Sequence, residues 1–447
     1  MVKKIFSLFF CIFLIAAVII TPLSAYAYEV NGFEITAKAG MLVSMDTGEI
    51  LYENNIDKKI YPASITKIMT AVVMLESGKY VPESKIAMTE KILTMILGTG
   101  SVVSNLRAGE KITHKDLLYY VLMSSAGDCT YLAAELCSGS VEAFVNEMNK
   151  KAAELGLKNT HYANPIGLHD DNHYTTVRDI YTLTKYALQN KTFKEVCETA
   201  RYTVPATNMS GQRILSTTNF LMDTTTNYYY QYAKGVKTGF TDEAGRCLVS
   251  TASYNGYNYM CIVTGCPGNQ KYHFSESSSL YRWAFNNFSF KEIAKSNEPV
   301  CEMPLELSLE TDFVPLYFKE PFTSVLPNEA DDSTIVIKTN LNSESVKAPI
   351  KKGQVLGTAD VIFAEKVIGT VDLIAAEDIK ESKLLVFVEY VKGVFSSVYM
   401  KVVYVVIALL IVGFILLCIK LNYSKIKKRK VKYVPYNGKE RKNNKND

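Results

Sequence analysis

A serine and a lysine three residues apart carry the most chemical information in this chain. Ser64 and Lys67 lie in the segment 61–70, where we expect a helix to open at the serine. Residues at i and i+3 share one helix face, so the Lys67 amine can remove the proton from the Ser64 hydroxyl. A serine hydroxyl is a poor nucleophile by itself. The pair therefore predicts an activated nucleophile, and the structural alternative is a chance pair on an exposed helix.

Other segments would complete a site for acyl transfer. Lys237, Thr238 and Gly239 follow one another at the end of a predicted strand. The cation could hold a substrate carboxylate, and the glycine would let a ligand approach the backbone closely. Ser125 lies in a predicted loop between two helices, where a second hydroxyl could relay a proton. The turn-rich segment 164–168 is a candidate wall of the site.

The elements that must position these residues are a mixture of helices and strands. Periodicity predicts a hairpin over 41–53, helices over 115–123, 128–137, 141–155 and 277–288, and strands at 236, 247–252 and 259–263. Helices gathered around an antiparallel sheet make an α+β domain. After residue 296, short runs at 334–338, 355–358 and 384–391 alternate with Pro, Asn, Asp and Gly. They predict a small all-β domain.

The N-terminus has the pattern of a signal peptide. Lys3 and Lys4 precede an apolar run over 5–20, and residues 25–27 read Ala-Tyr-Ala, the small-x-small form of a cleavage site. We predict a signal peptide over 1–27. An uncleaved anchor helix is the alternative, which Pro22 disfavours because it would break the helix near the cleavage site.

The C-terminus has the pattern of a membrane anchor. Residues 402–419 carry no charge and are bracketed by Lys401 and Lys420, which predicts a transmembrane helix over 398–420. A buried core helix is the alternative, but such helices usually keep a polar face. From Lys420 onward the chain has eleven Lys or Arg against two acids, whereas the whole chain has a net charge of only +4. The basic tail, 421–447, is therefore expected in the cytoplasm and the main domains outside, with no nucleic-acid partner.

A short polar run resembles a metal site but is not expected to be one. Residues 169–173 read His-Asp-Asp-Asn-His, with two imidazoles and two carboxylates. The same residue types form turns and hydrogen bonds readily. We expect neither a metal nor any other cofactor.

Taken together, the motifs resemble a known family. S-x-x-K at 64–67, a serine-led motif at 125–127 and K-T-G at 237–239 are typical of β-lactamases and penicillin-binding proteins. The segments 164–168 and 235–249 narrow the resemblance to low-molecular-weight penicillin-binding proteins that are serine-type D-alanyl-D-alanine carboxypeptidases. The resemblance runs from about Ala37 to Phe288. It implies a catalytic domain over 28–292 with the β-lactamase/transpeptidase-like fold, a β-rich domain over 297–392, and a bacterial cell-membrane location.

The resemblance also implies roles for individual residues. Ser64 would attack the carbonyl between two D-alanines of a peptidoglycan pentapeptide, with Lys67 as its base, and β-lactam antibiotics would acylate the same serine. Ser125 would pass a proton to the departing D-alanine. Lys237, Thr238 and Gly239 would bind the terminal carboxylate. Backbone N–H groups of Ser64 and Phe240 would form the oxyanion hole. Arg246 either adds positive charge for the carboxylate or is an ordinary surface arginine.

One position departs from the family pattern. The second motif usually reads Ser-x-Asn, and here it reads Ser-Ala-Gly at 125–127. The side-chain amide that normally steadies the lysine and contacts the substrate is missing at Gly127, although glycine lets other backbone come closer. Two other functional classes therefore stay open at this point. A β-lactamase would turn penicillin over rapidly, and a non-catalytic wall-binding protein would be indifferent to loss of Ser64.

Overall fold

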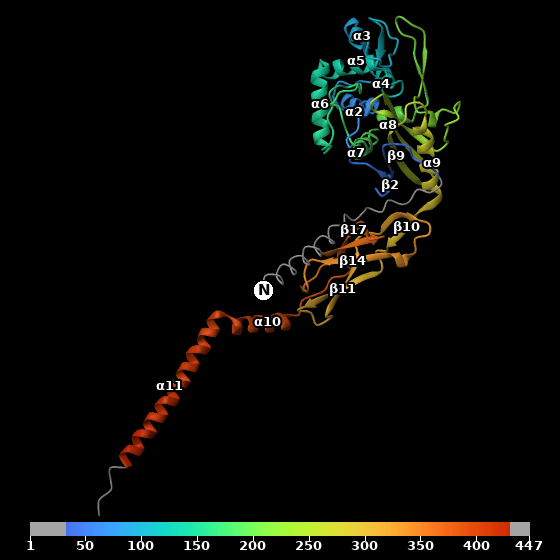
Figure 1. The fold of residues 1–447 in the computed structure, drawn as a ribbon. Helices are drawn as coiled ribbons and strands as arrows, with labels where there is room; N and C mark the ends of the chain where they lie inside the picture. Colours follow the sequence, from blue (N-terminus) through green and yellow to red (C-terminus); the bar gives the residue numbers. More distant parts are fainter. Residues whose placement is uncertain (1–32, 430–447) are drawn as a thin grey trace, which may run out of the picture. The chain divides into compact units, whose positions relative to one another are not determined.

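The computed structural model describes residues 33–429. The predicted signal peptide, 1–27, and residues 430–447 of the predicted tail lie outside the described residues. Within the described residues, the chain divides into two compact units: one comprises 33–295, 321–338 and 360–370, and the other comprises 296–320, 339–359 and 371–429. Figure 1 shows the elements in chain order.

A five-stranded antiparallel sheet forms the centre of the first unit. Its strands are β1 (Ala39–Ser44), β2 (Ile50–Asn54), β7 (Ala233–Thr241), β8 (Gly245–Tyr254) and β9 (Tyr257–Cys266). Their order across the sheet is β2-β1-β9-β8-β7, and every neighbouring pair is antiparallel. The hairpin predicted over 41–53 is therefore confirmed as β1 and β2.

Helices cover both faces of this sheet. One layer contains α2 (Lys67–Glu76), α4 (His114–Leu122), α5 (Gly127–Ser138), α6 (Val141–Glu154), α7 (Val177–Ala187) and α8 (Lys191–Glu198), and the other face is covered by α9 (Tyr272–Asn287) (Figure 1). The strands alternate accordingly, because successive side chains point to opposite faces. Met41 and Val43 pack in the cluster of the first layer, and Leu42 packs in the cluster that contains α9. The α+β prediction is confirmed.

Short elements complete this unit. They are the 3-10 turns η1 (Ala63–Thr66) and η2 (Phe220–Met222), helix α3 (Glu90–Ile96), and the paired strands β3 (Lys85–Ala87) with β4 (Lys111–Thr113), β5 (Arg201–Val204) with β6 (Arg213–Ser216), and β10 (Phe288–Ala294) with β13 (Phe322–Pro327).

Capping residues mark one end of each of three predicted helices. Thr113 and Asp116 form a capping box at α4, and the Ser140 hydroxyl accepts from the Ala143 N–H at the start of α6. Helix α5 ends at Gly139, which has φ +77°, a conformation that glycine adopts without strain. The predictions over 115–123, 128–137 and 141–155 each match a helix to within one residue at either end.

Most strands after residue 296 form a second sheet. These are β11 (Pro299–Glu306), β12 (Phe313–Phe318), β14 (Ile335–Leu341), β15 (Val346–Lys347), β16 (Val355–Phe363) and β17 (Lys366–Ala375), with the turn η3 (Asp332–Thr334) before β14. Their order is β14-β16-β17-β12-β11-β15. The strands predicted at 334–338 and 355–358 are thus confirmed as parts of β14 and β16, except that Thr334 belongs to the turn η3.

One predicted strand is wrong. Residues 384–391 belong to helix α10 (Lys383–Ser396), so the β-rich region ends before residue 392. Ser382 caps this helix, because its hydroxyl accepts from the Leu385 N–H. Leu384, Phe387 and Val388 recur at i, i+3 and i+4, a helical spacing that a short apolar run does not distinguish from a strand.

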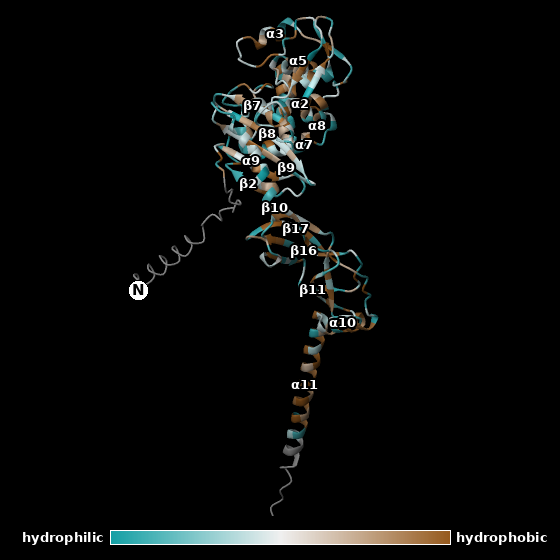
Figure 2. Ribbon diagram, turned by 90° about the vertical axis from the view of Figure 1, so that its right-hand side faces the viewer, coloured by the Kyte–Doolittle hydropathy of each residue, from teal (hydrophilic) through white to brown (hydrophobic). Residues whose placement is uncertain are grey.

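The last described element is long and apolar. Helix α11 (Val398–Arg429) contains the apolar stretch Val398–Ser424, whose most apolar 18-residue window has a mean hydropathy of 3.3 and is not buried. Figure 2 shows hydrophobic residues along most of its length. By length and composition this helix can cross a membrane, which fits the predicted anchor.

Candidate active site

Ser64 lies at the point where a 3-10 turn passes into a helix. It belongs to η1, and Lys67 is the first residue of α2, so the predicted helix begins three residues later than expected. The two side chains still lie on the same side of the chain, and the Lys67 Nζ donates to the Ser64 Oγ at 3.0 Å. Ala63, directly before the serine, has φ +47°, a strained conformation of the kind that concentrates at functional sites.

Lys67 is held as a buried amine. Its side chain is fully buried, and its Nζ also donates to the Ile166 carbonyl oxygen at 2.6 Å. Burial, followed by the positive charge of Lys237, holds the pKa of Lys67 well below its usual value. A neutral amine in contact with a hydroxyl can accept the hydroxyl proton.

A second buried lysine lies close to the first. Lys237, on β7, is 1% exposed, and its Nζ donates to the Thr238 carbonyl oxygen at 3.1 Å. Burial lowers the pKa of Lys237 to about 7. Next to it, the Thr238 hydroxyl donates to the Thr218 hydroxyl at 2.6 Å.

Strand β7 runs close beside the nucleophile. A Cβ placed on Gly239 would lie 3.1 Å from the Ser64 backbone nitrogen and 3.0 Å from the Pro62 carbonyl oxygen, so a side chain there would crowd the serine. The next residue, Phe240, is 46% exposed, and the Arg246 guanidinium lies 4.9 Å from the centre of its ring. Arg246 is fixed by its Nε, which donates to the Gly268 carbonyl oxygen.

These residues share one cavity of about 770 Å³. Ser64, Ser125, Thr238, Gly239 and Phe240 all line it, as does Arg246. The two buried lysines are not part of the lining: Lys67 is hydrogen-bonded to the Ser64 hydroxyl, and Lys237 to the carbonyl of Thr238. The fold thus brings the predicted serines and the 238–240 segment to one cavity and places a lysine directly behind each side of it.

The segment 164–168 fixes the position of Lys67. Its carbonyl groups accept from Lys67, as described, and from the Thr70 hydroxyl, which donates to the Pro165 oxygen at 2.7 Å. Gly167 has φ +86°, and a Cβ there would lie 1.9 Å from the Ala63 carbonyl oxygen. Glycine at this point lets the segment lie directly against the turn that carries the nucleophile.

His173 belongs to the same support, in keeping with the expectation that residues 169–173 form turns and hydrogen bonds. The Ala163 N–H donates to its Nδ1, so the ring proton is on Nε2 and is donated to the Thr66 hydroxyl at 2.7 Å. Burial lowers the pKa of His173 to about 4, which keeps the ring neutral. Within residues 33–429, no group of His, Cys, Asp or Glu side chains is arranged to hold a metal.

Ser125 lines the cavity, and Gly127, the position where the family usually has asparagine, follows two residues later. Ser125 is 8% exposed and has φ +60°, in the loop between α4 and α5. Two residues later, the Gly127 N–H donates to the Val102 carbonyl oxygen at 2.7 Å. The segment 99–102 also lines the cavity, and nothing in the sequence indicated its presence there.

Comparison with known proteins agrees with this geometry. The model of a family described as D-alanyl-D-alanine carboxypeptidase matches residues 25–268, and that of the C-terminal domain of penicillin-binding protein 5 matches residues 288–381. The D-alanyl-D-alanine carboxypeptidase DacF of Bacillus subtilis is 32% identical over 324 residues, which cover 72% of this chain and 80% of DacF.

Solved structures show the same fold. Penicillin-binding protein 5 from Haemophilus influenzae aligns with a TM-score of 0.63 and 28% identity, over 79% of this chain and all of the other. The Streptomyces K15 DD-transpeptidase aligns with a TM-score of 0.54 and 28% identity, over 57% of this chain and all of the other. The chain therefore belongs to the D-alanyl-D-alanine carboxypeptidase family of low-molecular-weight penicillin-binding proteins, and it is a serine-type hydrolase.

Proposed function

We propose that this protein removes the terminal D-alanine from peptidoglycan pentapeptides through an acyl-enzyme on Ser64. The observation that carries the proposal is the 3.0 Å contact between the Ser64 hydroxyl and the buried amine of Lys67. A lysine with a strongly lowered pKa is a suitable base for this hydroxyl at neutral pH. Membership of the carboxypeptidase family supports the same substrate class.

Acylation follows from the positions of these groups. The Ser64 oxygen attacks the carbonyl carbon between the two D-alanines while its proton passes to the Lys67 Nζ. The developing oxyanion would lie between the Ser64 and Phe240 N–H groups, and loss of one such donor costs about 2.7–4 kcal/mol in comparable sites. The C–N bond then breaks, and a proton relayed through Ser125 leaves with the amine of D-alanine.

Substrate orientation would come from the β7 side of the cavity. Lys237, once protonated, attracts the terminal carboxylate, and the Thr238 hydroxyl can donate to it. Arg246 lines the same cavity and adds positive charge. Water then attacks the ester on Ser64 and releases the shortened peptide. A β-lactam would acylate Ser64 by the same attack on its ring amide, but its leaving group would stay attached to the adduct.

Release of D-alanine tests this proposal directly. The full-length protein in detergent should release D-alanine from a pentapeptide ending in D-Ala-D-Ala, and Ser64→Ala should lower the turnover number by about 10⁴-fold or more, because the nucleophile is lost. Ser138→Ala, at the far end of α5, serves as the matched control and should retain full activity. Absence of release by the wild-type protein would overturn the proposal.

We also propose that α11 spans the cell membrane with the catalytic unit outside and the tail inside. The basic residues from Lys420 onward support this orientation. A protease added to intact spheroplasts should then remove the catalytic unit and leave a short membrane-bound fragment that contains the tail. Protection of the catalytic unit until the membrane is permeabilised would contradict the orientation.

A further inference from the structure

The space beside Gly127 is already filled by another part of the chain. A Cβ placed on Gly127 would lie 2.5 Å from the Ser101 Oγ, 2.8 Å from the Ile96 Cδ1 and 3.1 Å from the Ser101 Cβ. Distances below 3.0 Å do not occur between such atoms without movement of one of them. No side chain, asparagine included, fits at position 127 while Ser101 keeps its place.

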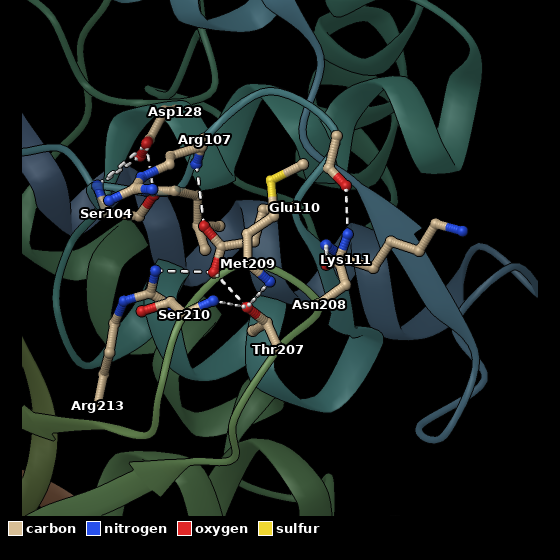
Figure 3. Close-up of polar contacts among 12 residues, drawn as sticks. Ser104, Arg107, Glu110, Lys111, Asp128, Thr207, Asn208, Met209, Ser210 and Arg213 are labelled. Atoms are coloured by element: carbon tan, nitrogen blue, oxygen red, sulfur yellow. Dashed lines mark hydrogen bonds and ion pairs between the residues drawn. The ribbon is translucent and has the colours of Figure 1, made fainter.

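The segment that carries Ser101 is anchored to the start of α5. The Gly127 N–H donates to the Val102 carbonyl oxygen at 2.7 Å. The fully buried carboxylate of Asp128 accepts from the Ser104 N–H at 3.0 Å and from the Ser104 hydroxyl at 2.5 Å. Figure 3 shows this contact between Asp128 and Ser104. These bonds fix the backbone on the C-terminal side of Ser101.

The buried carboxylate of Glu110 fixes the other end of the connection from residue 97 to residue 110. The Arg107 N–H donates to Glu110 at 3.1 Å, and Arg213 and the Thr207 hydroxyl each contact the same carboxylate at 2.7 Å (Figure 3). The side chain of Glu110 is fully buried, so these contacts are shielded from water. The connection from 97 to 110 is thus a fixed part of the site.

The Ser101 hydroxyl is available for a ligand. It lines the same cavity as Ser64 and Ser125. Within the ranges that the structure describes, its Oγ makes no hydrogen bond, whereas the neighbouring Thr99 hydroxyl donates to the Ile96 carbonyl oxygen. A hydroxyl both donates and accepts, so it can bond either a peptide N–H or a peptide carbonyl.

We propose that Ser101 replaces the asparagine of the family's second motif, and that its hydroxyl hydrogen-bonds the peptide backbone of the substrate next to the carbonyl attacked by Ser64. The inference rests on the proposed function. It assigns Ser101 as a substrate-binding residue and explains the glycine at 127. Because Gly127 has no side chain, Ser101 from another segment can place its hydroxyl where the asparagine side chain would otherwise lie.

Acylation kinetics test this assignment. We would measure the second-order rate constant for labelling of the full-length protein in detergent by a fluorescent penicillin, together with kcat/KM for D-alanine release. Ser101→Ala should lower both about tenfold, the usual effect of losing one substrate hydrogen bond, with an unchanged Tm. The matched control Ser138→Ala should change neither. Labelling of Ser101→Ala at the wild-type rate would overturn the inference.

A double variant distinguishes loss of the substrate contact from a general loss of folding. Gly127→Asn alone should acylate more slowly than the wild-type protein, because its side chain collides with Ser101 and Ile96. Adding Ser101→Gly should raise the rate above that of Gly127→Asn, since loss of the serine side chain removes the nearer collision and the asparagine then supplies the polar group. A double variant no faster than Gly127→Asn would contradict the exchange. If the wild-type protein itself is not labelled, the proposed function fails and this inference falls with it.

Discussion

A lysine amine acts as a base at neutral pH only where its surroundings disfavour the charged form. At Lys67 two causes act together: the side chain is fully buried, and a second cation, Lys237, lies nearby. The neutral amine can take the proton of Ser64 directly, because the Lys67 Nζ already lies 3.0 Å from the hydroxyl oxygen. The two lysines then need opposite protonation states, with Lys67 neutral and Lys237 charged to attract a carboxylate.

These requirements predict a bell-shaped pH dependence. Above the lowered pKa of Lys67 the base is available, so kcat/KM should rise to its plateau at a pH well below the ordinary pKa of a lysine. It should fall again as Lys237 loses its proton with a pKa of about 7. A bound carboxylate raises the pKa of Lys237, so the fall in kcat should lie at a higher pH than the fall in kcat/KM. D-alanine release measured from pH 4 to pH 10 checks both limbs.

Lys237→Arg is the informative variant for this profile. A guanidinium stays charged throughout the range, so the descending limb should disappear even if the maximal rate is lower. A kcat/KM that instead rises steadily from pH 7 to pH 10 would mean that Lys67 titrates near its ordinary value, and the account of the base would be wrong.

Among the elements, the segment 164–168 is as important as the helix that carries the nucleophile. It accepts hydrogen bonds from Lys67 and Thr70, and Gly167 lets it lie against Ala63. Gly167→Ala would force its Cβ to within 1.9 Å of the Ala63 carbonyl oxygen unless the backbone moves. We expect a loss of about 1–3 kcal/mol in the free energy of unfolding and a large fall in penicillin labelling.

Gly211→Ala is the matched control, since no atom lies within 4 Å of a Cβ there. Thermal or denaturant unfolding followed by circular dichroism measures the stability, and labelling measures the site. Equal behaviour of the two variants would show that the close approach at Gly167 is unimportant.

Sequence patterns predicted some elements well and failed for others, for physical reasons. The hairpin over 41–53 and the helices around 115–155 have clear periodicity and strong caps, so local chemistry determines them. Residues 384–391 form an apolar run without such signals, and helix and strand are equally compatible with it. The contact of Ser101 with Gly127 joins segments whose adjacency depends on the whole fold, and no local pattern encodes it. His173 lies in a run that was expected to form turns and hydrogen bonds, but the identity of its partners, Thr66 and Ala163, depends on tertiary contacts.

At the scale of the whole molecule, the chain combines a catalytic unit with a helix suited to lipid. All the residues that line the catalytic cavity belong to the first unit. Helix α11 leaves its apolar side chains exposed within the described part of the chain, which is stable in a bilayer and unfavourable in water. The family match over 25–268 and 288–381 covers the two folded regions.

The central claim is that a neutral Lys67 activates Ser64 to form a covalent acyl-enzyme. Its most direct test is to react the full-length protein with a penicillin, digest it, and locate the modified residue by mass spectrometry. The account predicts one stable adduct, on the peptide that contains Ser64, and no adduct in Ser64→Ala or at a pH where Lys67 is protonated. An adduct on any other residue, or none on the wild-type protein, would contradict it.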